Sequence, residues 1–233
     1  MSPSEVLKMN SKAVAFLAQG NHESTHFTLQ KALEGFRDVL RHGAHVDVEP
    51  LIDADEVDAA SLYTVAINDA QHHNVSYSSS CENSFVSVYR QAFVLTLDEQ
   101  QTRFSENEHT VPAILLYNMG LSSHIQALQT GQSAMYRKAL QLYNMAFIML
   151  EQSSDILNDM DVMVLLALSN NMCIISGYQF YDRPAAENSR LVMERIMTSA
   201  DCLESLEDED IEFFSLNLMF LSEYQNTALA PAA

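Results

Sequence analysis

Apolar and polar positions divide the chain into two helical regions separated by an acidic stretch. In the first region, apolar residues recur every three or four positions over about Ser4–Gln19 and His22–Arg41. This spacing places them on one face of an amphipathic helix. Gly20 lies between the two segments and Gly43 follows the second, where helices commonly end. Because the connection is so short, the two helices are predicted to pack antiparallel as a hairpin.

Helical periodicity returns near residue 110 and continues almost to the end of the chain. Five further helices are predicted, at about 110–128, 134–152, 159–180, 184–202 and 211–224. A polar turn separates the first two, and Pro184 suits the first turn of the fourth. The final six residues are predicted to form a frayed tail. The expected fold class is therefore all-α, built from antiparallel helical hairpins.

The stretch between the two helical regions is acidic and polar, with no Lys or Arg from residue 42 to residue 89. Low hydrophobicity with one sign of charge cannot offset the entropy lost on ordering, so residues 44–84 are predicted to be a largely irregular insertion. Leu62–Ile67 is an apolar patch within it that is a candidate for docking, and Phe85–Tyr89 alternates like a short extended piece. The expected organisation is a hairpin at 1–43, the insertion, and a helical region at 85–233, in one continuous domain.

One pair of predicted helices carries the pattern of a known repeat family. Its first helix holds Gly120, and its second holds a small, an aromatic and a small residue at Ala139, Tyr143 and Ala146. These three residues share one helix face. The pattern resembles the tetratricopeptide repeat, in which small residues let two helices come close while the ring fills the space between hairpins. The resemblance implies a short α-solenoid of stacked hairpins.

Fainter copies of the pattern occur in the other two hairpins. The corresponding positions are Ala13, Gly20 and Ala32 in the first pair, and Asn171 and Cys173 in the third. The last helix is expected to cover the apolar face on which such an array ends. The spacing departs from the family's period of roughly 34 residues, because an insertion follows the first hairpin and the connection within the second is too long. The number of repeats therefore stays open.

The resemblance implies a protein-interaction module or adaptor. Such arrays hold a peptide in their concave groove through the first helix of each hairpin. Asn118 matches a position that often holds the backbone of a bound peptide, and Asn171 is its counterpart. Lys8 and Lys12 are candidates for part of a basic clamp for a C-terminal carboxylate. That clamp is incomplete, because the first helix of the second hairpin has no Lys or Arg.

Charge and cysteine content narrow the partners and the compartment. The chain has 31 Asp and Glu against 12 Lys and Arg, a formal net charge of −19. Nucleic acids and anionic membranes require basic surfaces, so neither is expected, and a protein partner with a basic surface is favoured. The three cysteines are widely spaced and no signal-peptide pattern opens the chain. These features indicate the cytoplasm, with the nucleus as an alternative.

Motifs for catalysis and metal binding are missing from the sequence. It has no Gly-rich phosphate loop, no Gly-x-Ser-x-Gly elbow and no Cys-x-x-Cys pair, so neither an enzyme nor a cofactor is expected. His22 and His26 have the i, i+4 spacing of two metal ligands, but a third ligand is not evident, so no metal is expected.

Two functions of other classes stay open. The chain could be an all-α carrier of a small ligand, or an enzyme, with a pocket between its C-terminal helices lined by Met119, Tyr143, Met163 and Met172. It could also be a structural protein that self-associates through uncapped hairpin faces.

Overall fold

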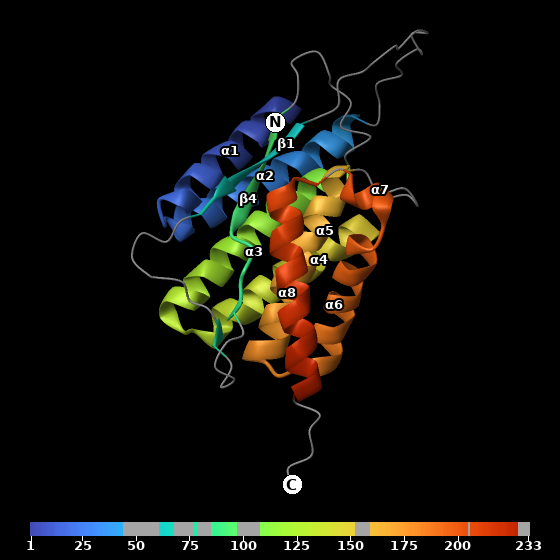
Figure 1. Cartoon of the computed structure of the whole chain (residues 1–233). Coiled ribbons are helices and arrows are strands. Elements are labelled where there is room, and N and C mark those ends of the chain that lie inside the picture. The colour runs from blue at the N-terminus through green and yellow to red at the C-terminus, as the bar shows by residue number, and fades with distance from the viewer. Residues whose placement is uncertain are drawn as a thin grey trace.

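The structure, a computed structural model, describes residues 1–43, 61–67, 77–78, 85–96, 108–151, 159–204 and 206–227. Over these residues the chain is mostly helical, with short antiparallel strand pairs between the second and third helices (Figure 1). The prediction of a predominantly helical chain is confirmed. Each of the predicted helical segments corresponds to a helix, although some ends differ.

Pairs of helices follow one another along the chain, and a final helix packs on the last pair (Figure 1). The pairs are α1 (Pro3–Ala18) with α2 (His22–Gly43), α3 (Thr110–Thr130) with α4 (Ser133–Glu151), and α5 (Asp159–Ile174) with α6 (Arg183–Met197). After α5 comes a π-helical turn at Ile175–Gln179, and the short α7 (Ala200–Leu203) leads to α8 (Asp208–Thr227). α2 packs on α3, α4 on α5, and α6 on α8, so the hairpins contact one another in chain order.

Local sequence signals set the ends of several helices. Ser2 is the N-cap of α1: its hydroxyl accepts a hydrogen bond from the Glu5 N–H, and the Glu5 carboxylate accepts one from the Ser2 N–H at 2.6 Å. Gly20 and Gly131 follow α1 and α3 with φ angles of +72° and +68°, in the left-handed region that favours glycine. Asp182 is the N-cap of α6, and a proline stands in the first turn of that helix, as predicted.

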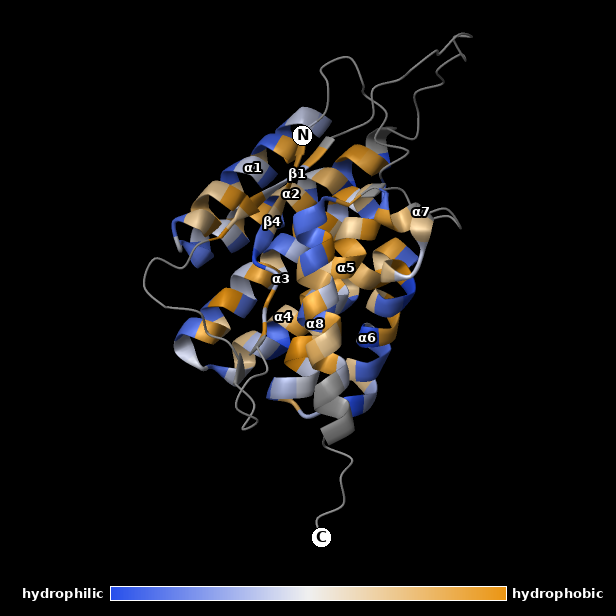
Figure 2. Ribbon diagram, viewed as in Figure 1, coloured by the Kyte–Doolittle hydropathy of each residue, from blue (hydrophilic) through white to orange (hydrophobic). Residues whose placement is uncertain are grey.

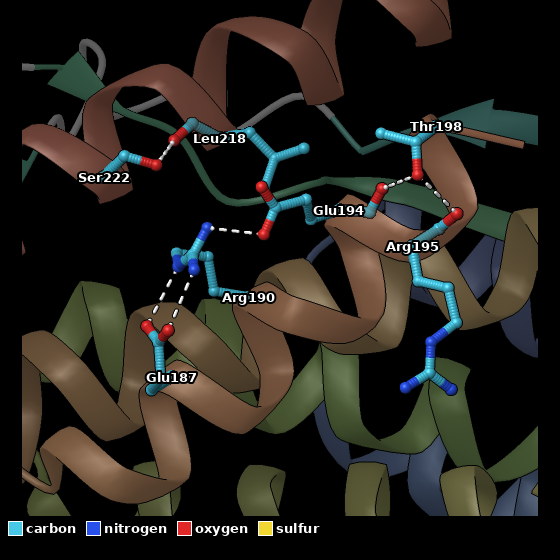
Figure 3. Close-up of polar contacts among 7 residues, drawn as sticks. All are labelled: Glu187, Arg190, Glu194, Arg195, Thr198, Leu218 and Ser222. Carbon is cyan, nitrogen blue, oxygen red and sulfur yellow. Dashed lines mark hydrogen bonds and ion pairs between the residues drawn. The ribbon is translucent and has the colours of Figure 1, made fainter.

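For the helix predicted at 184–202, the predicted C-terminal end is wrong. α6 stops at Met197, where the Thr198 hydroxyl donates to the Glu194 carbonyl at 2.9 Å (Figure 3). Within α6, the Arg190 guanidinium donates two hydrogen bonds to the Glu187 carboxylate, at 2.9 and 2.8 Å, and one to Glu194 at 3.1 Å (Figure 3). These pairs lie three and four positions apart, so they stabilise one partly exposed face of the helix.

α3 and α5 are the central helices of the molecule. Nearly every side chain of both is buried, whereas the other long helices bury one face only. Apolar residues accordingly gather along α5, as Figure 2 shows. In the described part of the chain, one stretch, Met160–Gln179, is long and apolar enough to cross a membrane, and 94% of its most apolar window is buried inside the protein. Such burial is the property of a core helix.

Two strand pairs lie between α2 and α3. β1 (Ser61–Ala66) pairs antiparallel with β4 (Gln91–Thr96), so that Ser61 faces Thr96, and β2 (Tyr77–Ser78) pairs with β3 (Phe85–Val86). The predicted irregular insertion at 44–84 therefore contains strands wherever the structure describes it, apart from Ile67. The rest of that insertion lies outside the described residues. Local composition did not reveal these strands because their partners lie up to 35 residues further along the chain.

Candidate functional site

The candidate site is formed where the helices hold residues 85–96, called the central segment below. This segment includes β3 and β4, and it contacts α1 and α3 at one end and α8 at the other (Figure 1). Most of its side chains are buried. On one edge it pairs with β1, and the Arg90 carbonyl accepts from the Ile67 N–H at 3.0 Å. On the other edge it meets polar side chains of the helices.

Asn118 of α3 binds the backbone of Phe93 through both ends of its amide. Its Oδ1 accepts from the Phe93 N–H at 3.0 Å, and its Nδ2 donates to the Phe93 carbonyl at 2.8 Å. Asn10 of α1 reinforces this contact, because its Nδ2 donates to the same carbonyl at 3.0 Å and its Oδ1 accepts from Asn118 at 2.9 Å. Both asparagines are buried, so each hydrogen bond is made away from water.

Asn171 of α5 repeats this arrangement on Tyr89. Its Oδ1 accepts from the Tyr89 N–H at 2.9 Å, and its Nδ2 donates to the Tyr89 carbonyl at 3.1 Å. The Asn171 Nδ2 also donates to the Tyr143 hydroxyl at 3.3 Å, which ties the amide to α4. The Tyr117 hydroxyl lies between the two asparagine sites and donates to the carbonyls of Gln91 and Tyr89, at 3.1 and 3.3 Å.

Asn217 of α8 makes the third contact of this kind, on Ser87. Its Oδ1 accepts from the Ser87 N–H at 3.0 Å, and its Nδ2 donates to the Ser87 carbonyl at 2.7 Å. Asn170 donates to the same carbonyl at 3.2 Å and to Asn171 Oδ1 at 3.1 Å, and it accepts from Asn217 at 2.7 Å. The five asparagines, called the asparagine row below, are Asn10, Asn118, Asn170, Asn171 and Asn217.

The asparagine row replaces a neighbouring strand. A side-chain amide offers one acceptor and two donor hydrogens, which match the N–H and C=O of a peptide backbone. Each of Asn118, Asn171 and Asn217 therefore pairs with the N–H and the C=O of one residue of the central segment, as a neighbouring β-strand would. These contacts involve only backbone atoms of the central segment, so they do not depend on which side chains the bound residues carry. The first helix of every pair contributes to the row, α1 and α3 with one asparagine each and α5 with two, and α8 contributes the fifth.

Aromatic side chains fill the space beneath the central segment. The Tyr89 ring packs against Phe213 and Phe214, with centroids 5.3 and 5.0 Å away, and stacks on Phe93 at 6.3 Å. The Phe93 ring lies 4.7 Å from that of Tyr117. Four of these rings are buried and that of Phe213 is partly buried, so the segment is anchored by apolar contact as well as by its backbone.

The Tyr89 hydroxyl reaches an acidic surface at the start of α8. It donates to Asp210 Oδ1 at 3.0 Å. Burial raises the pKa of the Tyr89 hydroxyl well above its ordinary range, and the negative charge of Asp210 adds to that effect. Burial also raises the pKa of Asp210, with smaller contributions from Glu207 and Glu209, although the hydrogen bond from Tyr89 opposes the shift. Tyr89 therefore acts as a neutral hydrogen-bond donor.

The predicted binding residues lie in two different places. Asn118 and Asn171 belong to the asparagine row, where they hold a backbone of the chain itself. Lys8 and Lys12 are exposed on α1, whereas Asn10, midway between them in sequence, is buried. A two-residue step turns a helix by about 200°, so the two lysines face away from the row. The structure does not bring them into the site.

The predicted packing residues are buried, with one exception. Ala13, Ala32, Ala139, Tyr143, Ala146 and Cys173 are all at most 2% exposed. A Cβ on Gly120 would lie 2.6 Å from Tyr143 Cε1, so a glycine is required at this close approach. Gly20 is the exception: a Cβ there would meet no atom within 4 Å, and its role is the left-handed turn after α1.

The residues considered for other functions are engaged in packing. Met163 and Met172 are buried in the hydrophobic core and Met119 packs against it. His22 Nδ1 lies 3.0 Å from Ser122 Oγ, and His26 Nε2 lies 3.0 Å from Ser123 Oγ, so both histidines join α2 to α3. In the part of the chain that the structure describes, no group of three or more His, Cys, Asp or Glu side chains is placed to hold a metal ion.

Asn10, Asn170, Asn217 and the central segment were not among the predicted site residues. A signal for Asn10 was present in the sequence, because it occupies the apolar face of α1 that Val6, Ala13 and Leu17 define. A polar residue at a core position needs a partner. That partner is the backbone carbonyl of Phe93, 83 residues away, and no local sequence pattern identifies it.

No protein-family model, curated protein or solved structure matches this chain.

Proposed function

We propose that the chain is a tetratricopeptide-like α-solenoid that acts as a protein-interaction module, and that its asparagine row holds an extended segment of a partner protein by the backbone. The observation that carries this proposal is the bidentate binding of Phe93 and Tyr89 by Asn118 and Asn171. Amides that satisfy one extended backbone suit another, because every residue except proline presents the same N–H and C=O.

In this proposal the central segment is a resident occupant that a partner segment replaces. In the sequence, 41 residues (44–84) separate the end of α2 from the central segment, and 13 residues (97–109) separate the segment from the start of α3. Because the occupant belongs to the same chain, it competes intramolecularly with a partner segment that arrives from solution. A partner therefore binds only when its own contacts outweigh this competition, which makes the exchange selective.

The partner segment and the central segment compete for one site, so a test has to weaken the central segment without changing the asparagine row. Both segments use the same asparagines, so an asparagine variant of the wild-type chain weakens resident and partner alike, and the exchange changes little. The double substitution Tyr89→Ala and Phe93→Ala removes the two aromatic anchors of the resident and leaves the row intact. This variant, otherwise unchanged over residues 1–233, is called the opened variant below.

A displayed library of random peptides selected on the opened variant tests the proposal. Selected peptides are expected to lose at least tenfold in affinity when Asn118→Ala or Asn171→Ala is added, because backbone groups would be left unpaired. Asn144→Ala is the matched control, since Asn144 lies exposed on α4. Peptides that bind every asparagine variant equally well would contradict the proposal.

Hydrogen exchange on the wild-type chain gives an independent test that needs no variant. If the central segment leaves while the helices stay folded, the Tyr89 and Phe93 amides exchange faster than amides near the middle of α3. Equal protection would mean that the segment opens only when the whole protein unfolds, and exchange with a partner would be ruled out.

A further inference from the structure

The side chains of the central segment show what an incoming segment has to carry. Tyr89 is 3% exposed and Phe93 is 0% exposed, and each ring has its own aromatic surroundings. The two rings also stack on each other although they are four residues apart in the sequence. A replacement segment fills both places only if it carries two rings at this same spacing.

The first aromatic place favours tyrosine over phenylalanine. The Tyr89 hydroxyl donates to Asp210 at 3.0 Å. A phenylalanine would fill the same space and leave this partly buried carboxylate without its donor. The analogue without a hydroxyl therefore loses one hydrogen bond to a charged group and binds more weakly. The second place has no such requirement, because the Phe93 side chain is apolar and lies in the hydrophobic core beside the rings of Tyr89 and Tyr117.

Charge favours a segment without acidic residues. The central segment reads Phe-Val-Ser-Val-Tyr-Arg-Gln-Ala-Phe-Val-Leu-Thr, with one arginine and no carboxylate, in a chain whose formal net charge is −19. Glu207, Asp208, Glu209 and Asp210 stand together at the start of α8, beside the Tyr89 hydroxyl. An acidic incoming segment would be repelled there, and a basic one attracted.

We infer that the partner is a protein carrying a Tyr-x-x-x-Phe segment of neutral or positive charge, and that the central segment is a built-in copy of this ligand which keeps the site closed until the partner replaces it. This inference rests on the proposed function and adds the sequence class of the partner. The tyrosine hydroxyl binds Asp210, both rings enter the aromatic cluster, and the asparagine row holds the backbone.

A synthetic peptide of residues 85–96, blocked at both ends and labelled with a fluorophore, is the probe. Fluorescence anisotropy is expected to show at least tenfold tighter binding to the opened variant than to wild type, because the wild-type site is already filled. Tyr→Phe, Tyr→Ala and Phe→Ala versions of the peptide are expected to bind the opened variant more weakly, the last two by at least tenfold. Replacing the arginine by glutamate is expected to weaken binding further at low salt.

The outcomes separate this inference from the proposed function. If library peptides bind the opened variant through Asn118 and Asn171 while the probe and its alanine versions bind alike, the sequence class is wrong and the proposed function stands. If neither the probe nor any library peptide binds an opened variant whose helicity by circular dichroism equals that of wild type, both are overturned. If the opened variant does not fold, the probe is titrated into wild type while exchange of the Phe93 amide is followed. Faster exchange with added probe supports displacement, and unchanged exchange at saturating probe overturns it.

Discussion

At the scale of single residues, the asparagine row depends on an amide and not merely on a polar group. The Asn118 Nδ2 donates to the Phe93 carbonyl and to Asn10 Oδ1, so an aspartate of the same shape would set a carboxylate against two acceptor oxygens. Asn118→Asp is therefore expected to destabilise the fold by about 3 kcal/mol or more, since a buried charge would lack donors. Urea unfolding followed by circular dichroism measures this, and the exposed Asn144→Asp is the control. Equal midpoints for the two variants would contradict the account.

Gly120 offers a prediction about close packing. The structure leaves no room for a Cβ, which would lie 2.6 and 2.7 Å from two atoms of the fully buried Tyr143 ring. Gly120→Ala is expected to cost about 1–3 kcal/mol of unfolding free energy, as overpacked core positions do. Gly177→Ala is the matched control, because a Cβ there meets only Ala186 Cβ at an ordinary 3.5 Å. Chemical unfolding that gives both alanine variants the same stability would show that α3 and α4 are free to separate.

His124 makes the stability depend on pH. It is fully buried, neither ring nitrogen has a hydrogen-bond partner among the described residues, and its ring meets Tyr136 and Tyr143 edge-on. Burial, with a smaller effect of the Arg90 charge, lowers the pKa of His124 from 6.5 to about 3. The unfolded chain therefore takes up a proton below pH 6.5 that the folded chain refuses. Stability is full above pH 6.5 and falls toward pH 3, by up to about 1.4 kcal/mol per pH unit.

His124→Phe tests this dependence on pH. The variant is expected to lose stability less steeply than wild type between pH 6.5 and 4.5, and to be at least as stable at pH 7, because it removes two unpaired nitrogens. Burial also lowers the pKa of His26, to about 4, but this residue is common to both proteins and cancels in the difference. Urea midpoints at several pH values provide the comparison. If the stabilities of the two proteins change equally with pH, His124 does not contribute to the pH dependence.

At the scale of elements, the helices were predictable and the central segment was not. The N-terminal pair, predicted at 4–19 and 22–41, forms at 3–18 and 22–43, because caps and apolar spacing are local signals. Phe85–Tyr89 was predicted to be extended and Phe85–Val86 forms β3, but the contacts of this stretch could not be predicted. They join Tyr89 to Asn171 and Phe93 to Asn10, which lie more than 80 residues away, and no local pattern encodes such pairs. Asn118 and Asn171 were identified by resemblance, which pointed to backbone binding but not to the chain's own backbone as the occupant.

The ion pairs of α6 allow a prediction about that helix. The Arg190 side chain is 13% exposed and bridges Glu187 and Glu194, whereas Arg195, five residues further on, is exposed and joins no ion pair in Figure 3. Arg190→Ala is expected to lower the unfolding free energy by about 1 kcal/mol, because a bidentate pair and its apolar stem contacts are lost. Arg195→Ala is expected to change it by less than half as much. Thermal unfolding at low and high salt separates the two contributions, since only the ionic part is screened. Equal losses for both variants would show that the bridging geometry contributes nothing.

At the scale of the whole molecule, the net charge of −19 acts on folding and on binding in opposite directions. Like charges repel one another more in the compact state than in the expanded unfolded chain. The same charges attract a basic partner segment. Salt screens both effects, with a Debye length of about 30 Å at 0.01 M and about 10 Å at 0.1 M. It should therefore strengthen the fold while it weakens association.

Raising sodium chloride from about 10 to about 300 mM at pH 7 is accordingly expected to raise the melting temperature of the wild-type chain, over the range in which the Debye length shortens most. Choline chloride at equal ionic strength is the control, because screening depends on ionic strength and not on the identity of the cation. Over the same range, the probe peptide is expected to bind the opened variant more weakly, since it carries one arginine and no carboxylate while the protein is strongly acidic. Scanning calorimetry and anisotropy titration provide the two measurements. A melting temperature that falls with salt would show that short-range contacts and not the summed charge govern the salt dependence of folding. A probe affinity that rises with salt would show the same for binding.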